Sequence, residues 1–153
     1  MGQGVQGALG GKGLRLVFDT RSLLKLLFDE PGGDDVAYLV GESEAGRAEG
    51  FISAITLTEL WYLVSRRDAR VADSSVQTVL GSLDLVPIEE TISIQAGKYK
   101  ASKSIPIADA LIAATAAAVR GTVVTDDKDF SGLGVDVKDE TTLARELRRK
   151  RPP

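Results

Sequence analysis

Short apolar runs alternate with longer segments of helical periodicity along most of this chain. Five runs are short, rich in apolar residues and closed by polar or turn-forming residues, a pattern that predicts buried strands. They are "LRLVF" at 14–18, "GFISAI" at 50–55, "LDLVPI" at 83–88, "GTVVTDD" at 121–127, which runs into an acidic turn, and "VDVK" at 135–138. Helical spacing of apolar residues covers 20–28, 34–48, 57–67, 71–82, 89–102, the segment that starts at 106, and the basic segment after 138.

This alternation of strands and helices is typical of an α/β fold with a mainly parallel sheet covered on both faces. The 153 residues contain no internal repeat and no linker-like segment, and this length fits one domain with a real core. We therefore predict a single domain.

Four acidic residues fall where such a sheet builds its binding site. Asp19 directly follows the first predicted strand, and Glu59 lies one turn into the helix after the second. Asp127 follows the "TVVT" strand, and Asp109 begins the helix that leads into that strand. Because ligands of open α/β sheets bind outside the carboxyl ends of the strands, we expect these four side chains to lie at one edge.

Each acid also has an ordinary structural explanation. Asp19 is suited to cap the helix at 20–28, and Thr56 and Glu59 have the spacing of a capping box. Asp109 lies near a helix N-terminus, where the helix dipole favours negative charge, and "DDKDFSG" at 126–132 reads as a polar turn. Capping does not explain why Asp109 stands within "IPIADALIAATA", since a buried carboxylate needs compensation.

Composition narrows the chemistry that such acids support. The chain has no cysteine and no histidine, which excludes disulfides, thiolate zinc sites and catalysis by imidazole. Clustered carboxylates repel one another and either take up protons or bind cations, and all-oxygen ligands select Mg²⁺ or Mn²⁺. In a chain without histidine, hydrolysis of a phosphodiester by water that such an ion activates is the simplest hydrolytic reaction for these residues.

The two ends of the chain differ in character from its middle. "MGQGVQGALGGKG" has no apolar core of a signal peptide and predicts a disordered, Gly-rich extension over 1–13. The net charge is −3, yet "RELRRKR" at 145–151 carries five basic residues and one acid. That basic tail over 145–153 is either a solvated end or a contact for the phosphates of a bound polymer. No apolar stretch is long enough to cross a membrane, so we expect a cytoplasmic protein.

Four motifs together resemble a known family. In order, "LVFDTRSLLKLLFDEPG", "ISAITLTELW", "IPIADALIAATA" and "VVTDDKDF" are similar to the acidic motifs of PIN-domain proteins, most of all the VapC-type toxins of VapBC toxin–antitoxin pairs. The resemblance extends from 14 to about 138, and we take 14–144 as the PIN domain. It implies a three-layer α/β/α fold and an endoribonuclease that depends on Mg²⁺ or Mn²⁺. It also implies an RNA substrate, a homodimer and inhibition by a cognate VapB-type antitoxin.

The same resemblance assigns roles to individual residues. Asp19, Glu59, Asp109 and Asp127 match the four acids that hold the metal and carry out catalysis. Auxiliary positions are Thr20, Thr125 and Asp129.

Two residues depart from the family pattern. Arg21 stands where a small residue is usual and either crowds the metal or contacts RNA phosphate. Asp126 stands where a neutral or basic residue is common, which leaves the identity of the fourth acid open among Asp126, Asp127 and Asp129.

Two other functions compete with the ribonuclease. A PIN-like module that binds RNA or a partner without cutting is one. A phosphatase with an aspartyl nucleophile is the other, but its chemistry typically wants a second acid two positions after the first, where this chain has Arg21.

Two predicted helices carry more large apolar residues than one face of a small domain needs. Leu23, Leu26 and Leu27 lie on the first of them, and Trp61 and Tyr62 on the helix that ends near 67. We expect part of this surface to form a dimer interface or an antitoxin groove.

Overall fold

The structure, a computed structural model, describes residues 13–151, so the predicted extension before Gly13 and the last two residues lie outside the described part. The sheet has five strands in the order β3-β2-β1-β4-β5, and every neighbouring pair is parallel. The strands are β1 (Leu14–Phe18), β2 (Ala48–Ser53), β3 (Asp84–Val86), β4 (Thr122–Val124) and β5 (Asp136–Lys138). All five predicted strands are confirmed, with shifted ends.

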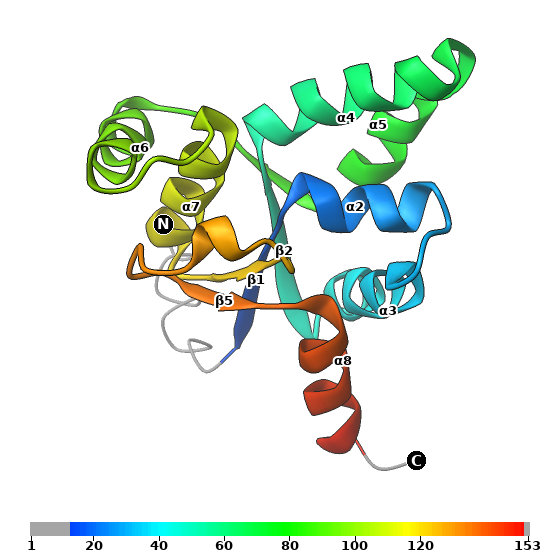
Figure 1. Cartoon of the computed structure of the whole chain (residues 1–153). Coiled ribbons are helices and arrows are strands. Elements are labelled where there is room, and N and C mark those ends of the chain that lie inside the picture. Colours follow the sequence, from blue (N-terminus) through cyan, green and yellow to red (C-terminus); the bar gives the residue numbers. More distant parts are fainter. Residues whose placement is uncertain (1–12, 152–153) are drawn as a thin grey trace.

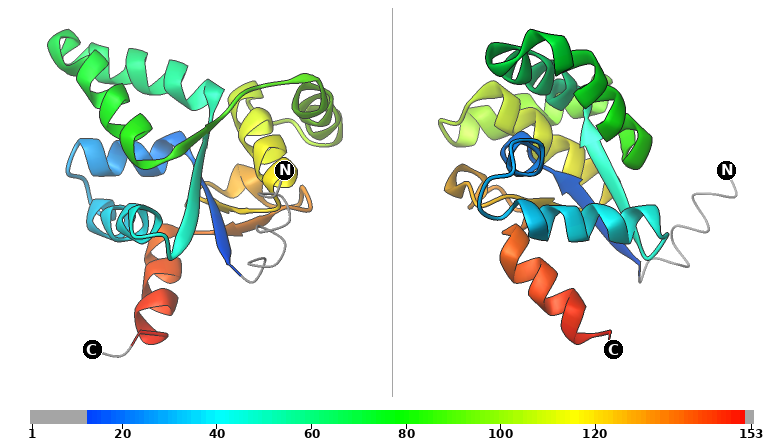
Figure 2. Two further views of the ribbon diagram at one scale, coloured as in Figure 1. Left: turned by 180° about the vertical axis from the view of Figure 1, so that it is seen from behind. Right: turned by 90° about the vertical axis from the view of Figure 1, so that its right-hand side faces the viewer.

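Helices cover both faces of this sheet (Figure 1). The α-helices are α2 (Thr20–Leu27), α3 (Gly33–Glu44), α4 (Ala54–Arg67), α5 (Ala72–Ser82), α6 (Glu90–Ser102), α7 (Ile107–Val119) and α8 (Glu140–Arg149); two 3₁₀ turns are η2 (Ala69–Val71) and η3 (Lys128–Phe130). Figure 2 shows the sheet edge-on between α6 and α7 on one side and α2 and α3 on the other. The predicted three-layer α/β/α fold is confirmed.

The central strand β1 supplies side chains to two separate cores. Leu16 and Phe18 pack in the core beneath α2, α3 and α8, whereas Val17 packs in the core beneath α6 and α7. Successive side chains of a strand point to opposite faces, so a continuous apolar run such as "LVF" at 16–18, buried at every residue, serves a strand that is covered on both sides.

The helix α3 ends earlier than the sequence pattern predicts. Gly46 has a left-handed backbone with φ of 77°, its N–H donates to the carbonyl of Ser43, and the N–H of Arg47 donates to that of Glu42. These two bonds form a Schellman C-cap, which stops the helix at Glu44 instead of 48.

The predicted capping box at Thr56 and Glu59 is wrong. β2 pairs with β1 from Ala48 and with β3 as far as Ser53, and α4 begins at the next residue, Ala54. Ser53 is therefore the N-cap, and its hydroxyl accepts a hydrogen bond from the N–H of Ile55 at 3.3 Å. Thr56 lies inside the first turn and is buried.

The predicted tail that starts at 145 continues the helix α8, which packs against α3. The guanidinium of Arg148 lies 3.1 Å from Asp35 and over the ring of Tyr38, and Arg151 lies 2.8 Å from the buried Glu42. Two of the five basic residues of "RELRRKR" are thus paired with acids of α3.

Strand order places a crevice between β1 and β4. The chain runs outward through β2 and β3 on one side of β1 and through β4 and β5 on the other, so β1 and β4 flank the point where the order reverses. In open parallel sheets this is where ligands bind, beyond the carboxyl ends of the strands. Within residues 13–151, no helix has the length and apolar character needed to cross a membrane.

Candidate metal centre

Asp19 lies at the carboxyl end of β1 and is 2% exposed. Its backbone N–H donates to the carbonyl of Val124, which continues the pairing of β1 with β4 by one residue. Asp19 occupies the N-cap position of α2, but its side chain makes no capping bond there. The carboxylate instead accepts a hydrogen bond from the hydroxyl of Thr125 at 2.7 Å. The side chain is thereby directed toward the end of β4.

Thr125 connects two of the predicted acids. Its hydroxyl donates to Asp19 and accepts a hydrogen bond from the N–H of Asp127 at 3.0 Å. Asp127 then caps η3, because its carboxylate accepts from the N–H of Asp129 at 2.9 Å. The segment after β4 is therefore fixed to β1 by side-chain bonds as well as by the sheet.

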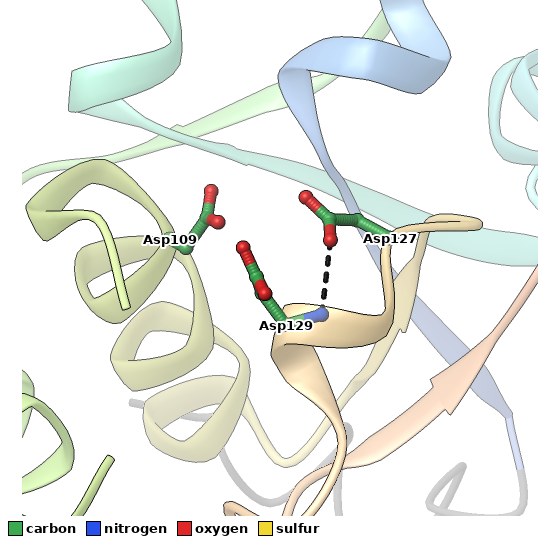
Figure 3. A group of neighbouring side chains, drawn as sticks. All are labelled: Asp109, Asp127 and Asp129. Carbon is green, nitrogen blue, oxygen red and sulfur yellow. Dashed lines mark hydrogen bonds between the residues drawn. The ribbon is translucent and has the colours of Figure 1, made fainter. Parts of the chain in front are cut away.

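Three carboxylates converge in this crevice. Asp109 points from the first turn of α7 toward Asp127 and Asp129, which lie on the turn after β4 (Figure 3). One oxygen from each of the three lies within 4.8 Å of one from each of the others. This arrangement is suited to a hard divalent cation with oxygen ligands.

Glu59 faces the same crevice from α4. Its carboxylate accepts a hydrogen bond of 2.7 Å from the hydroxyl of Thr20, which is the first residue of α2. Thr20 also lies 3.3 Å from the hydroxyl of Thr56. The two predicted hydroxyl positions thus have comparable roles: Thr20 holds Glu59, and Thr125 holds Asp19.

Burial and repulsion change the acidity of Asp19. Burial raises the pKa of Asp19 to about 6, and the negative charges of Asp127 and Glu59 add to this. The hydrogen bond from Thr125 opposes the rise, because it stabilises the ionised form.

Asp109 is affected more strongly. Burial is the first cause that raises the pKa of Asp109 to about 7. Four neighbouring carboxylates add repulsion, and they belong to Asp19, Asp127, Asp129 and Glu59. A cation bound among these groups would remove the repulsion and favour the ionised form of each.

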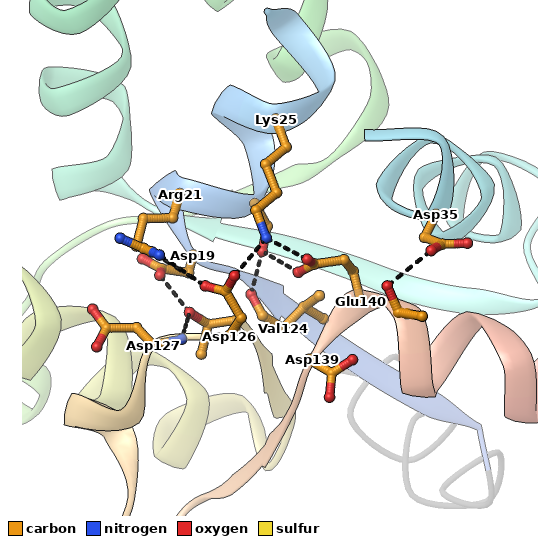
Figure 4. A network of polar contacts seen from close by, with 12 residues as sticks. Asp19, Arg21, Lys25, Asp35, Val124, Asp126, Asp127, Asp139 and Glu140 are labelled. Atoms are coloured by element: carbon orange, nitrogen blue, oxygen red, sulfur yellow. Dashed lines mark hydrogen bonds and ion pairs between the residues drawn. The ribbon is translucent and has the colours of Figure 1, made fainter. Parts of the chain in front are cut away.

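Asp126 is held apart from this cluster. Its carboxylate accepts hydrogen bonds from Lys25 at 2.7 Å and Arg21 at 3.0 Å, and these lower its pKa (Figure 4). Lys25 also donates to the buried Glu140 at the start of α8. Asp126 therefore belongs to an ion-pair network, whereas its neighbour Asp127 faces Asp109.

The sequence pattern missed that network. Lys25, Asp126 and Glu140 come from three separate segments, and no local spacing links them. Arg21 binds Asp126, an arrangement different from either role considered for it from sequence.

The residues that converge in the crevice lie within a match to a known protein family. The PIN domain family matches residues 16–135. A comparison with curated proteins finds no match.

Several solved structures share the fold. VapBC2 from Rickettsia felis, bound to a DNA fragment from its promoter, is 21% identical with a TM-score of 0.70, and covers 82% of this chain and 98% of its own. DNA-bound VapBC from Salmonella typhimurium is 21% identical with a TM-score of 0.68, covering 83% and 98%. VapC20 from Mycobacterium tuberculosis, described as a sarcin-ricin loop cleaving toxin, is 20% identical with a TM-score of 0.63, covering 78% and 95%.

The family match spans well over half of the chain and includes Asp19, Glu59, Asp109, Asp127 and Asp129. The chain belongs to the PIN domain family.

Proposed function

We propose that this protein is a Mg²⁺- or Mn²⁺-dependent endoribonuclease and the toxin of a VapBC-type toxin–antitoxin pair. The observation that carries the proposal is the convergence of Asp109, Asp127 and Asp129, with Asp19 and Glu59 close enough to raise the pKa of Asp109. The structural similarity to VapBC complexes and to VapC20 supports the choice of substrate and biological role.

The residues present fit a divalent ion. Asp109, Asp127 and Asp129, whose oxygens converge, would hold it, with Asp19 as a further oxygen ligand from the end of β1. When bound, Mg²⁺ or Mn²⁺ supplies charge stabilisation for a phosphodiester under attack by water. Glu59, fixed by Thr20, would orient the attacking water or help hold a second ion.

A surface cleft beside the acids offers room for a nucleic acid strand. It has a volume of about 720 Å³, and Asp127 is among the residues that line it. Lys128 and Lys138 line it and are the groups that would contact phosphates. Acidic residues line it as well, and a cation bound at the acid cluster would offset part of their charge: Asp126, Asp127, Asp139 and Glu140. This is consistent with RNA that reaches the acids along the surface between η3 and α8.

An apolar cavity on another part of the surface suits the antitoxin. It has a volume of about 310 Å³ and lies between α2, α3 and α5. Leu23, Leu26 and Leu27, which the sequence predicts as part of a docking surface, line it together with Val40 and Leu83. A cavity of this kind takes the apolar face of an amphipathic helix, which is the segment we expect the antitoxin to provide.

Trp61 and Tyr62 do not line that cavity. They are 45% and 42% exposed on α4, and Trp61 donates a hydrogen bond to Asp73. The homodimer and the cytoplasmic location stay predictions.

The central test is cleavage of RNA by the pure protein. We expect cutting in Mn²⁺ or Mg²⁺ and none in EDTA, and Asp109→Asn should lower the rate by about 10²-fold or more. Asp126→Asn is the matched control, because Asp126 lies in the neighbouring ion-pair network and should retain metal-dependent cleavage. Equal cutting with and without metal would overturn the proposal, and RNA binding without any cutting would favour the non-catalytic module.

A further inference from the structure

The acid cluster joins two parts of the chain that meet only in the tertiary structure. Asp109 lies on α7, whereas Asp127 and Asp129 lie on the turn that follows β4 (Figure 3). Phe130 anchors that turn in the core beneath α6 and α7. A cation site formed across this junction depends on the spacing between the turn and the helix.

Lys103 bridges the junction. Its ammonium group donates to the carbonyls of Ser131 at 2.7 Å, Asp129 at 2.8 Å and Lys128 at 3.4 Å. A lysine has three N–H donors and no acceptor, so these three carbonyls match its full donor set. They lie at the end of η3; the carbonyl of Lys128 also accepts from the N–H and hydroxyl of Ser131, so the bonds from Lys103 to Asp129 and Ser131 are the ones that add a connection to the turn.

Lys103 is itself held firmly relative to α7. It ends α6, where its N–H donates to the carbonyl of Tyr99 at 3.0 Å. Lys100 donates to the carbonyl of Ile105 at 2.6 Å, and the buried Ile105 directly precedes Pro106, the N-cap of α7. The segment that carries Lys103 therefore leads directly into the helix that carries Asp109.

We propose that Lys103 is a positioning residue that sets the spacing between Asp109 and the pair Asp127 and Asp129. It acts through the backbone of η3 and makes no contact with the metal. This inference rests on the proposed function, because the spacing matters to the extent that the acids bind a cation. Without the ammonium group, the turn would keep Phe130 as its anchor but lose three bonds to the α6–α7 segment.

The test compares three single substitutions. Lys103→Met removes the charge and the donors at similar length, and Lys103→Arg keeps a charged donor group. Lys98→Met is the matched control, because Lys98 is exposed on the same helix α6 and its loss changes net charge equally. Two measurements are made on each folded protein: calorimetric titration with MnCl₂, and amide hydrogen exchange of residues 126–133 without metal.

We expect Lys103→Met to weaken Mn²⁺ binding by about 10- to 100-fold, as the loss of groups that orient metal ligands commonly does. Exchange should accelerate in residues 126–133 and not in β1 or α4. Lys103→Arg should restore most of both properties, and Lys98→Met should match the wild type. If Lys103→Met reduces the yield of folded protein, Lys103→Gln takes its place in both measurements.

Two results would overturn the inference: wild-type Mn²⁺ affinity in Lys103→Met, or unchanged exchange over residues 126–133. Failure of the proposed function looks different. A wild-type protein that binds no Mn²⁺ would reject the metal centre, and the exchange measurement alone would then decide whether Lys103 holds the turn.

Discussion

Asp109 illustrates how a single residue can be costly to the fold and useful to the site. The helix dipole at the start of α7 favours the ionised form of Asp109, but burial and four surrounding carboxylates disfavour it more strongly. The pKa of Asp109 is therefore raised. No ion pair with Asp109 occurs among residues 13–151, so the compensation that the sequence demands is a proton or a bound cation.

This predicts an unusual pH dependence for the metal-free protein. The pKa is raised to about 6 for Asp19 and about 7 for Asp109, whereas both groups titrate near their ordinary, lower values in the unfolded chain. From about pH 4 to 7 the folded state therefore binds more protons, and stability falls as pH rises through this range. Thermal melting in EDTA should occur at a lower temperature near pH 8 than near pH 5.5.

Asp109→Asn provides the control for this experiment. The variant cannot ionise at that position, so its melting temperature should vary less with pH and exceed that of the wild type near pH 8. Carboxyls with lowered pKa, such as Asp126 and Asp139, stabilise the fold above their ordinary values near 4 and lose this effect only as pH falls from there through their lowered pKa, so they do not interfere. Identical pH profiles for the two proteins would contradict the raised pKa of Asp109.

Glu59 can be tested separately from the fold. It does not cap α4, and a glutamine oxygen can still accept the hydrogen bond from Thr20. Glu59→Gln should therefore keep the metal-free melting temperature or raise it slightly, and lower the cleavage rate in Mn²⁺ on the order of 10²-fold. Glu49→Gln, at the exposed start of β2, is the control. Wild-type cleavage by Glu59→Gln would remove Glu59 from the site.

At the scale of elements, the helices contribute residues both to the candidate metal centre and to the apolar cavity proposed for the antitoxin. The first turns of α2 and α7 carry Thr20 and Asp109 to the crevice, and the second turn of α4 carries Glu59 there. The rest of α2 contributes leucines to the apolar cavity shared with α3 and α5. A ligand in the cavity and a metal in the crevice would thus contact opposite ends of one short helix.

A charge placed in the cavity should separate these two functions. Leu27 is partly buried at the end of α2, so Leu27→Glu would put a carboxylate where the apolar face of the antitoxin helix is expected, at a cost of about 2 kcal/mol or more. Co-purification with a tagged cognate antitoxin should be lost while metal-dependent cleavage remains. Leu85→Glu, at an exposed position of β3, should retain the antitoxin. Retention by both variants would place the antitoxin elsewhere.

At the scale of the whole molecule, charge is distributed unevenly. The chain carries a net charge of −3, with acids gathered at the crevice and basic residues at the end of α8. Figure 1 places α8 at the opposite end of the molecule from α4 and α5. Arg148 and Arg151 serve the contact with α3, whereas Arg149 and Lys150 are exposed.

The two groups of basic residues should respond differently to substitution. If the end of α8 contacts RNA, Arg149→Gln together with Lys150→Gln should weaken RNA binding and flatten its salt dependence, because fewer counterions are released. Metal dependence should not change. Arg151→Gln should instead lower the melting temperature, since it leaves the buried Glu42 with one cation fewer. A salt slope unchanged by the double substitution would show that this end is merely solvated.

Local patterns in the sequence determined the elements and their order. A run of apolar residues ending at Asp19, or helical spacing that begins near Asp109, reflects interactions within a few residues, so the alternation of strands and helices could be predicted together with the acids at the strand ends. The absence of histidine and cysteine likewise restricted the chemistry without reference to the fold.

The tertiary structure decided what depends on partners distant in the chain. β2 pairs with β1 and β3 as far as Ser53, α4 begins at the next residue, and the predicted capping box does not form. Lys25 draws Asp126 into an ion pair with α2, while the bond between Thr125 and Asp127 turns the next acid toward Asp109. Adjacent residues of the same type were thereby given different roles, and no local preference distinguishes them, because the groups that do so come together only when the sheet and helices pack.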